Sequence, residues 1–201
     1  MNTKTAPTER RSARERLLDA ADELFYEEGI QTVGIDRVIA HAGVAKASLY
    51  DLFGSKEELV RSYLQRRHQL RQARMRDRIA RHERPREKIL SLFDVFAEAA
   101  ANPKFSGCAF ARAGAEARPG SSVKAAVDES RAWTLSLFTE LATELGVADP
   151  DLLGLQLVSL YDGASMSAYI DRNPRAARVA RATAAMLVDA AIAAHEPDTH
   201  P

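Results

Sequence analysis

The sequence predicts an all-α protein, and three observations lead to that prediction. Apolar residues recur every three to four positions along most of the 201 residues, which is the spacing that forms one face of a helix. β-branched residues are sparse, and no stretch shows the period of two expected of a strand. Glycines, prolines and capping residues divide the chain into segments of helical length.

The first predicted helix follows a polar stretch, residues 1–11, that is expected to be a disordered arm. The helix begins at Ser12-Ala-Arg-Glu15, a capping box in which the serine hydroxyl and the glutamate carboxylate satisfy the first free backbone N–H groups. Gly29 supplies the end of this helix.

Two short helices come next, at about residues 35–41 and 45–52, on either side of the turn Ala42-Gly43-Val44. This is the spacing of a helix-turn-helix. Its predicted core consists of Val38, Ala42, Val44, Leu49 and Phe53. That packing leaves Lys46, Ala47 and Tyr50 pointing outward, where small neighbouring residues would let the helix enter a DNA groove. From the spacing alone, DNA binding and an ordinary pair of short helices are about equally expected.

Capping residues and prolines also mark the ends of the remaining predicted helices. A second capping box, Ser55-Lys-Glu-Glu58, opens a long helix that reaches roughly to His82. Pro85 starts another helix, which ends near Asn102-Pro103. A short piece at residues 107–117 and a loop at residues 118–122 follow, and the remaining predicted helices are at about residues 123–145, 150–170 and 175–195.

The amino-acid composition limits the kinds of function and the cellular location that are expected. The 28 Lys and Arg residues balance 28 Asp and Glu residues, so the net charge gives no global signal for nucleic acid and any case for DNA must be local. One cysteine, Cys108, excludes an internal disulfide framework and fits a reducing compartment. The N-terminal residues include no apolar leader, and the longest apolar run, at 152–161, is too short to span a bilayer. A cytoplasmic protein is therefore expected.

An extended string of residues with fixed gaps points to one class of protein. The string comprises Ala21, Phe25 and Gly29, then Ala42-Gly43-Val44, then Leu49-Tyr50-x-x-Phe53-x-x-Lys56-x-x-Leu59. Because of it, the stretch 17–64, about a quarter of the chain, resembles the DNA-binding domain of the TetR family of bacterial transcriptional regulators. The resemblance implies a helix-turn-helix DNA-binding domain, residues 1–60, on a helical ligand-binding and dimerisation domain, residues 61–201. It also implies a homodimer on a palindromic operator, usually a repressor released by a small molecule.

The resemblance implies specific DNA contacts. They fall at Gly34, Arg37, Lys46, Ala47, Ser48, Tyr50 and Lys56. Residues 46–48 match the base- and phosphate-facing start of the recognition helix, whereas Tyr50 and Lys56 match phosphate contacts. Two positions depart from the family pattern: Val33-Gly34 replaces a frequent Thr or Ser, and Leu52 replaces a frequent His. Some phosphate contacts are therefore expected either to be missing or to be replaced by backbone N–H groups at Gly34.

The large side chains of the second domain are candidates for core or for the lining of a ligand pocket. As core they need no further explanation, but a pocket between helices would be lined by the same residues, with a few polar groups orienting the ligand. The candidates are Phe93, Phe96, Cys108, Phe110, Arg112, Glu116, Trp133, Leu137, Tyr161 and Met166. Cys108 lies in a Gly-Cys pair that also resembles a stretch of some TetR-family regulators. It is expected to be a packing residue, with an electrophile sensor as the alternative.

Two further surfaces are predicted on the second domain. The last two helices are rich in small residues, which allow close helix approach and favour a homodimer formed through them. The long helix after Ser55 is strongly basic and is expected to be a solvated face that pairs with acidic residues of neighbouring helices. Its arginines are Arg66, Arg67, Arg71, Arg74, Arg78 and Arg81.

Other functions stay open at this point. The same fold would serve an activator or a ligand-independent DNA-binding regulator. A small helical enzyme that uses Cys108 or His41 is disfavoured, because the spacing suggests no nucleophile–base pair, phosphate loop or metal-ligand cluster, and no cofactor is expected. The expected partners are double-stranded DNA, a second copy of the chain and an unidentified small molecule, with no membrane.

Overall fold

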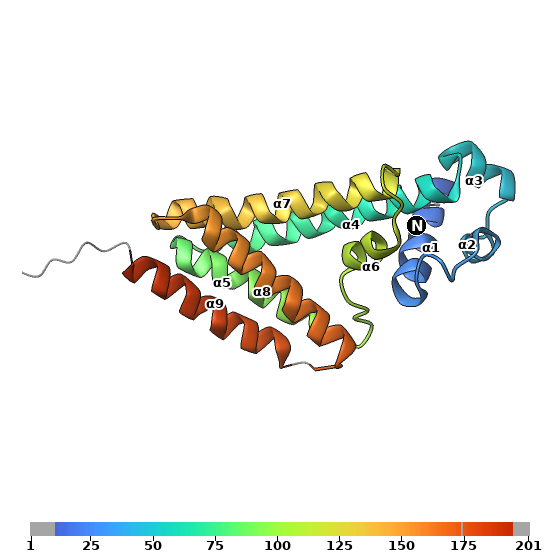
Figure 1. Ribbon diagram of the computed structural model, residues 1–201. Helices are drawn as coiled ribbons and strands as arrows, with labels where there is room; N and C mark the ends of the chain where they lie inside the picture. The colour runs from blue at the N-terminus through green and yellow to red at the C-terminus, as the bar shows by residue number, and fades with distance from the viewer. Residues whose placement is uncertain (1–10, 174, 195–201) are drawn as a thin grey trace, which may run out of the picture. The chain divides into compact units, whose positions relative to one another are not determined.

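The computed structural model of the chain describes residues 11–173 and 175–194. Every regular element in these ranges is a helix, so the all-α prediction is confirmed. In chain order (Figure 1) the helices are α1 (Ala13–Glu28), α2 (Ile35–Ala42), α3 (Lys46–Phe53), α4 (Lys56–Ile79), α5 (Pro85–Ala100), α6 (Ala109–Glu116), α7 (Ser122–Leu145), α8 (Pro150–Ile170) and α9 (Ala176–Ala193). The chain divides into two compact units, one ending at Tyr63 and one starting at Leu64. Apart from Arg11, the predicted arm lies outside the described residues.

The start of α1 confirms the predicted capping box. The backbone N–H of Glu15 donates to the Ser12 hydroxyl over 3.2 Å, and the backbone N–H of Ser12 donates to the Glu15 carboxylate over 2.8 Å. The Ser12 N–H and the Ser12 hydroxyl, which also donates to the Glu15 carboxylate over 2.8 Å, both stabilise the charged carboxylate and lower the pKa of Glu15. Two donors that a helix start leaves without partners are thus satisfied within four residues of sequence.

Several helix ends differ from the prediction by a few residues, and the ends of α4 and α7 show why. α4 ends at Ile79 instead of reaching His82, although the His82 N–H still bonds the Ile79 carbonyl in a turn. α7 begins at Ser122, one residue before the predicted start of that helix at residue 123. The reason is that the Ser121 hydroxyl accepts a hydrogen bond from the Lys124 N–H, over 3.1 Å, and caps the helix there.

The core of the first unit is built on α1. The buried face of that helix carries Leu17, Ala20, Ala21, Leu24 and Phe25. Phe25 meets Tyr63 of α4 edge to face, with ring centroids 5.7 Å apart. Of the predicted helix-turn-helix core, Val38, Ala42, Leu49 and Phe53 are buried, whereas Val44 is half-buried because it lies in the turn outside both helices.

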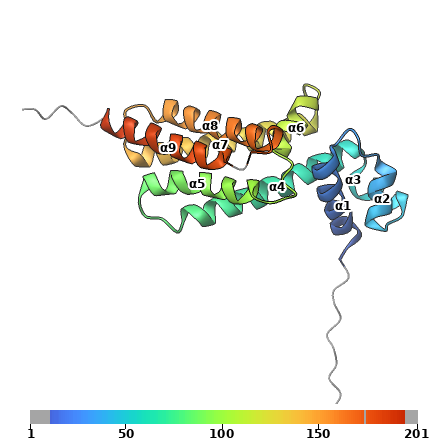
Figure 2. The ribbon, with the colours of Figure 1, turned by 90° about the horizontal axis from the view of Figure 1, so that it is seen from below.

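The second unit is a helical bundle whose core comes mostly from α5, α7, α8 and α9. Helices α8 and α9 run antiparallel side by side, and α9 also packs along α5 (Figures 1 and 2). Close approach of α8 to α7 depends on Gly154, since a Cβ there would lie 2.4 Å from the Thr139 Oγ1. Large, fully buried side chains of the unit include Met75, Ile89, Leu92, Phe93, Phe138 and Leu157.

Ion pairs on the surface link the helices of the second unit. Arg78 of α4 contacts Glu98 of α5 at 2.6 Å, and Arg181 of α9 contacts Asp94 of α5 at 2.7 Å. Arg78 therefore pairs with a neighbouring helix as predicted for the basic face of α4. Exposed pairs of this kind each contribute little to stability.

Among the residues that the structure describes, no helix is both long enough and apolar enough to cross a bilayer.

Candidate functional site

Three interactions fix the turn between α2 and α3 and the helix that follows it. Gly43 has φ +61°, a left-handed conformation that favours glycine, and its N–H bonds the last carbonyls of α2. Arg16 of α1 donates a hydrogen bond to the Gly43 carbonyl over 3.1 Å. Arg14 of α1 stacks over the Phe53 ring, with its Cζ 4.8 Å from the ring centroid. Helix α1 thus fixes the direction of α3, a role for Arg14 and Arg16 that sequence reasoning missed.

The first turn of α3 presents its side chains to solvent. Lys46 and Ala47 are exposed, Ser48 is half-buried and Tyr50 is 45% exposed, whereas Leu49 between them is fully buried. Ala45 occupies the capping position and has no side-chain oxygen to cap the helix. The backbone N–H groups of this turn, at the positive end of the helix dipole, are therefore oriented toward an incoming anion such as a phosphate.

Three predicted cationic contacts differ in how they are held. Lys46 donates to Asp36 of α2 over 2.9 Å, and this hydrogen bond raises the pKa of Lys46, so the side chain stays charged. Arg37 forms two hydrogen bonds to the Glu28 carboxylate of α1, one of them 2.7 Å long. Lys56 donates to the Ile30 carbonyl over 2.7 Å and is half-buried. Lys46 is thus the most accessible of the three, and Lys56 also ties α4 to the end of α1.

Gly34 precedes α2 and leaves that helix without a side-chain cap. Its backbone, at φ −73° and ψ 156°, suits any residue, and a Cβ placed there would meet nothing within 4 Å. Gly34→Ser is expected to raise the free energy of unfolding by about 0.5–1 kcal/mol, because a hydroxyl cap is added and the unfolded chain loses freedom. Urea denaturation followed by circular dichroism measures this difference.

Gly34→Ala is the matched control for that substitution. It restricts the unfolded chain equally but supplies no hydroxyl, and alanine is a poor capping residue, so the two effects nearly cancel. An alanine variant as stable as the serine variant would contradict the capping explanation.

In the second unit, the structure gathers some of the candidate pocket residues around Tyr161 of α8. The Tyr161 ring centroid lies 5.7 Å from that of Phe93 and 5.3 Å from that of Phe96, both on α5. Burial disfavours the tyrosinate and raises the pKa of Tyr161 to about 12. Its hydroxyl therefore stays protonated and able to donate a hydrogen bond.

A second aromatic group surrounds two polar residues of α4. Phe110 and Trp133 both contact the His68 ring edge to face, with centroids 6.2 Å and 5.5 Å away. The guanidinium of Arg71 stacks over the same two rings, at 4.8 Å and 6.0 Å. His68 and Arg71 were not predicted as site residues. The signal available in the sequence was their spacing of three, which places both on one face of a helix.

The other candidate pocket residues are more scattered. Leu137 is buried in the core, and Cys108 is a free, half-buried thiol at the residue before α6. Arg112 donates to the Ser106 carbonyl over 3.2 Å and stacks on the Tyr169 ring. Glu116 is exposed and Met166 is 50% exposed, so neither joins the aromatic groups.

His41, one of the two residues considered for an enzyme, lies at the surface of the first unit. His41 contacts Glu23 of α1 at 3.0 Å, and both side chains are largely exposed. Within the described ranges of the chain, no group of three or more His, Cys, Asp or Glu side chains is arranged to hold a metal ion.

Comparisons with known proteins cover the first unit and the whole chain. Residues 17–63 match the model of the family described as bacterial regulatory proteins, tetR family. The transcriptional activator FasR of Mycolicibacterium smegmatis is 45% identical over 53 residues, which are 26% of this chain and 24% of that protein. The chain spans between 24% and 47% of the length of the curated relatives it matches.

Two solved structures resemble the chain over nearly its full length. A TetR-family transcriptional regulator from Streptomyces coelicolor has a TM-score of 0.81 and 32% identity, covering 92% of this chain and 96% of that one. A TetR transcriptional regulator from Streptomyces avermitilis has a TM-score of 0.81 and 34% identity, covering 90% and 98%. With the family model on the helix-turn-helix and this agreement over both units, the chain belongs to the TetR family of bacterial transcriptional regulators.

Proposed function

We propose that this chain is a ligand-responsive repressor that binds a palindromic operator as a homodimer. The observation that carries the proposal is the first turn of α3, where Lys46, Ala47 and Tyr50 are exposed around backbone N–H groups while Leu49 anchors the helix. A helix held in this way can enter the major groove, reading base edges with its start and phosphates with its flanks. Operator DNA is in the bacterial cytoplasm, and we place the protein there with it.

The homodimer of this proposal forms through α8 and α9. Both helices carry large apolar side chains that are exposed in the single chain, and such patches mark interaction surfaces. They are Leu152, Leu155, Met166, Ile170, Val179 and Met186. Two copies of the hairpin pack as four helices about a two-fold axis, and two recognition helices then reach half-sites about 34–36 Å apart.

Ligand response requires two states of the dimer with different spacing of the recognition helices. A ligand among the aromatic side chains of the second unit favours the state with the wrong spacing, by as much as its affinities for the two states differ. Helix α4 contributes residues to both units and is the segment through which we expect the change to pass. Because the ligand favours the dimer state with the wrong spacing, the affinity of the protein for its operator falls.

Fluorescence anisotropy with the DNA upstream of the protein's own gene tests the DNA contacts. The double variant Lys46→Gln with Tyr50→Phe is expected to bind at least about 10-fold more weakly, since it loses a charge-assisted and a neutral phosphate contact. The slope of log affinity against log salt concentration should fall by about one. Lys56 is left unchanged because its bond to Ile30 supports the fold.

Lys124→Gln is the matched control for loss of charge. Like Lys46, Lys124 is a lysine paired with an aspartate, Asp128, but its side chain is only 40% exposed and it lies on α7 of the second unit. It should leave both affinity and salt slope unchanged. Specific binding that survives intact in the double variant would contradict the assignment of these contacts. A wild-type protein that shows no specific binding would contradict the proposal that this DNA contains its operator.

An activator of the same fold is the second candidate. The observation that favours it is the 45% identity between part of this chain and the activator FasR. Transcript levels of the neighbouring genes in a deletion strain separate the two: they rise when a repressor is lost and fall when an activator is lost.

A further inference from the structure

We propose that the ligand of the second unit is an organic acid, whose carboxylate binds Arg71 and Arg74 beside His68 and whose apolar body contacts Phe110 and Trp133. The inference rests on the ligand response proposed above and specifies the chemistry of the ligand. It comes from three residues of α4 at successive spacings of three, which share one helix face.

Two buried nitrogen atoms on this face have no hydrogen-bond partner among the described residues. They are the Nδ1 of His68, a side chain that is 7% exposed, and the Nε of Arg71. Burial, and then the charge of Arg71, lower the pKa of His68 and keep its ring neutral. Because the Nε2 of His68 faces the amide nitrogen of Gln72 at 2.9 Å, the proton of the neutral ring belongs on Nδ1. Both nitrogen atoms therefore carry an N–H group that has no acceptor among the described residues.

The rest of the Arg71 side chain is already anchored. Its Nη2 donates to the Ser130 hydroxyl over 2.7 Å and to the Thr134 hydroxyl over 2.8 Å, both on α7. These partners are neutral, so they orient the guanidinium without cancelling its charge. A fixed guanidinium with an unused Nε–H is suited to a planar carboxylate.

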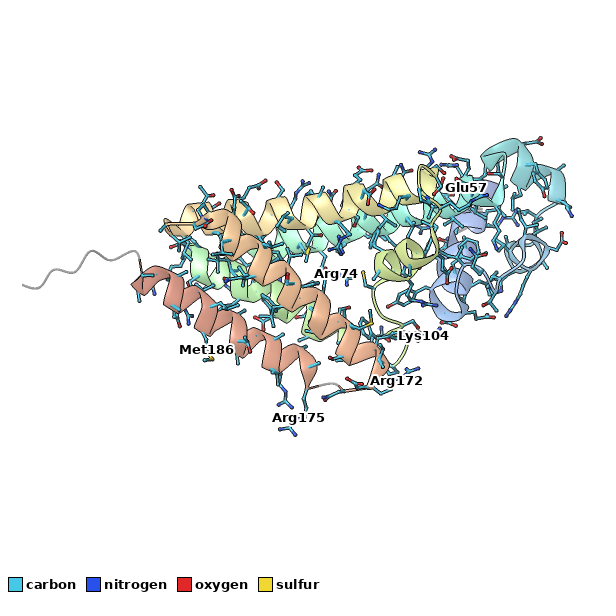
Figure 3. All side chains as sticks on the ribbon, viewed as in Figure 1. Glu57, Arg74, Lys104, Arg172, Arg175 and Met186 are labelled. Atoms are coloured by element: carbon cyan, nitrogen blue, oxygen red, sulfur yellow. The ribbon has the colours of Figure 1, made fainter. Side chains whose placement is uncertain are left out.

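Arg74 adds a second positive charge to this face. It is exposed, and it projects from α4 on the side where α6 and α8 lie (Figure 3). Arg71 and Arg74 both act electrostatically on the Tyr161 hydroxyl, so the two charges converge on one region. Within the described chain neither arginine has a carboxylate partner, whereas Arg78, one turn further along α4, pairs with Glu98. The two guanidinium groups are therefore suited to pair with the carboxylate of an acidic ligand, since Glu129, which acts electrostatically on His68, forms no ion pair with either of them in the described part of the chain.

The surroundings of the donors determine the rest of the ligand. Phe110 and Trp133 both contact His68 and Arg71 and form the apolar surroundings of these donors. The apolar body of such an acid would pack against the Phe110 and Trp133 rings. Its carboxylate would accept hydrogen bonds from the two buried nitrogen atoms that otherwise have no partner among the described residues. A small hydrophilic anion would accept these hydrogen bonds but would not pack against the rings.

Trp133 provides a direct readout, because it is the only tryptophan of the chain and contacts both His68 and Arg71. The full-length protein is titrated at constant ionic strength with cyclohexanecarboxylate and octanoate, and with the amide of each acid as a neutral counterpart. The acids are expected to change the fluorescence saturably and to bind about 10-fold or more tightly than the amides.

Substitutions locate the binding site. Arg71→Met and Arg74→Met should each weaken acid binding about 10-fold. The exposed Arg74 makes no hydrogen bond within the described chain, so its variant tests the proposal even if Arg71→Met misfolds. Arg76→Met is the matched control: Arg76 also stacks on Trp133, at 5.8 Å, but has no buried orphaned nitrogen, and its variant should bind within about twofold of the wild type.

The proposal is overturned if neither acid gives a saturable change, if amides bind as tightly as acids, or if Arg76→Met weakens binding as much as the other two variants. Anisotropy of labelled operator DNA, recorded in the same titration, tests the proposed function separately. Acids that bind and leave operator affinity unchanged would refute the ligand response and retain the acid site.

Discussion

Replacing Met186 with lysine is expected to make the protein monomeric and to weaken operator binding about 100-fold or more. Met186 is 71% exposed in the single chain and projects outward from α9 (Figure 3). In a two-fold symmetric dimer each substitution appears twice, and two like charges would be taken out of water without partners. A monomer reaches one half-site at a time, so the gain from simultaneous binding of two half-sites is lost.

Leu155→Lys on α8 should have the same effect, since Leu155 is 54% exposed and belongs to the other helix of the proposed interface. Leu70→Lys is the matched control, because Leu70 is an apolar side chain of α4 that is 59% exposed. Sedimentation equilibrium gives the oligomeric state, and fluorescence anisotropy gives the affinity. A dimer that persists in Met186→Lys and Leu155→Lys, or dissociates equally in Leu70→Lys, would contradict the α8–α9 interface.

Local signals explain why the helices could be predicted from the sequence. The cap of α1 depends on Ser12 and Glu15, three residues apart, and the turn after α2 depends on one glycine, Gly43. The exposure of Lys46 and Tyr50 followed from the burial of Leu49 at helical spacing. Each of these features is determined by residues within about one helical turn of one another.

Contacts between distant residues explain what the sequence did not reveal. Arg71 was expected in a solvated basic face, but it meets Ser130 and Thr134, which lie 59 and 63 positions away. Lys56 was expected to contact phosphate, and its amino group bonds the carbonyl of Ile30. Helical periodicity says which side of α4 a residue occupies, and only the tertiary packing decides which sides are buried.

Gly107→Ala is expected to lower the free energy of unfolding of the second unit by about 2–5 kcal/mol. Gly107 is buried with φ +80°, where a side chain is strained by about 1–2 kcal/mol. A Cβ there would also lie 2.9 Å from the Cγ of Tyr169 on α8, and such overpacking costs about 1–3 kcal/mol. Arg112 covers the Tyr169 ring as well, so the ring has little freedom to move away.

Gly120 allows the two contributions to be separated. It has a similar φ, +75°, but nothing lies within 4 Å of the position of its Cβ. Gly120→Ala should therefore cost only the backbone strain, about 1 kcal/mol, by urea denaturation. In a Tyr169→Ala background the cost of Gly107→Ala should fall to that of Gly120→Ala, because the ring is gone. Equal costs for the two single variants would mean that α8 does not hold the chain before α6 through Tyr169, and that α6 is positioned by its other contacts alone.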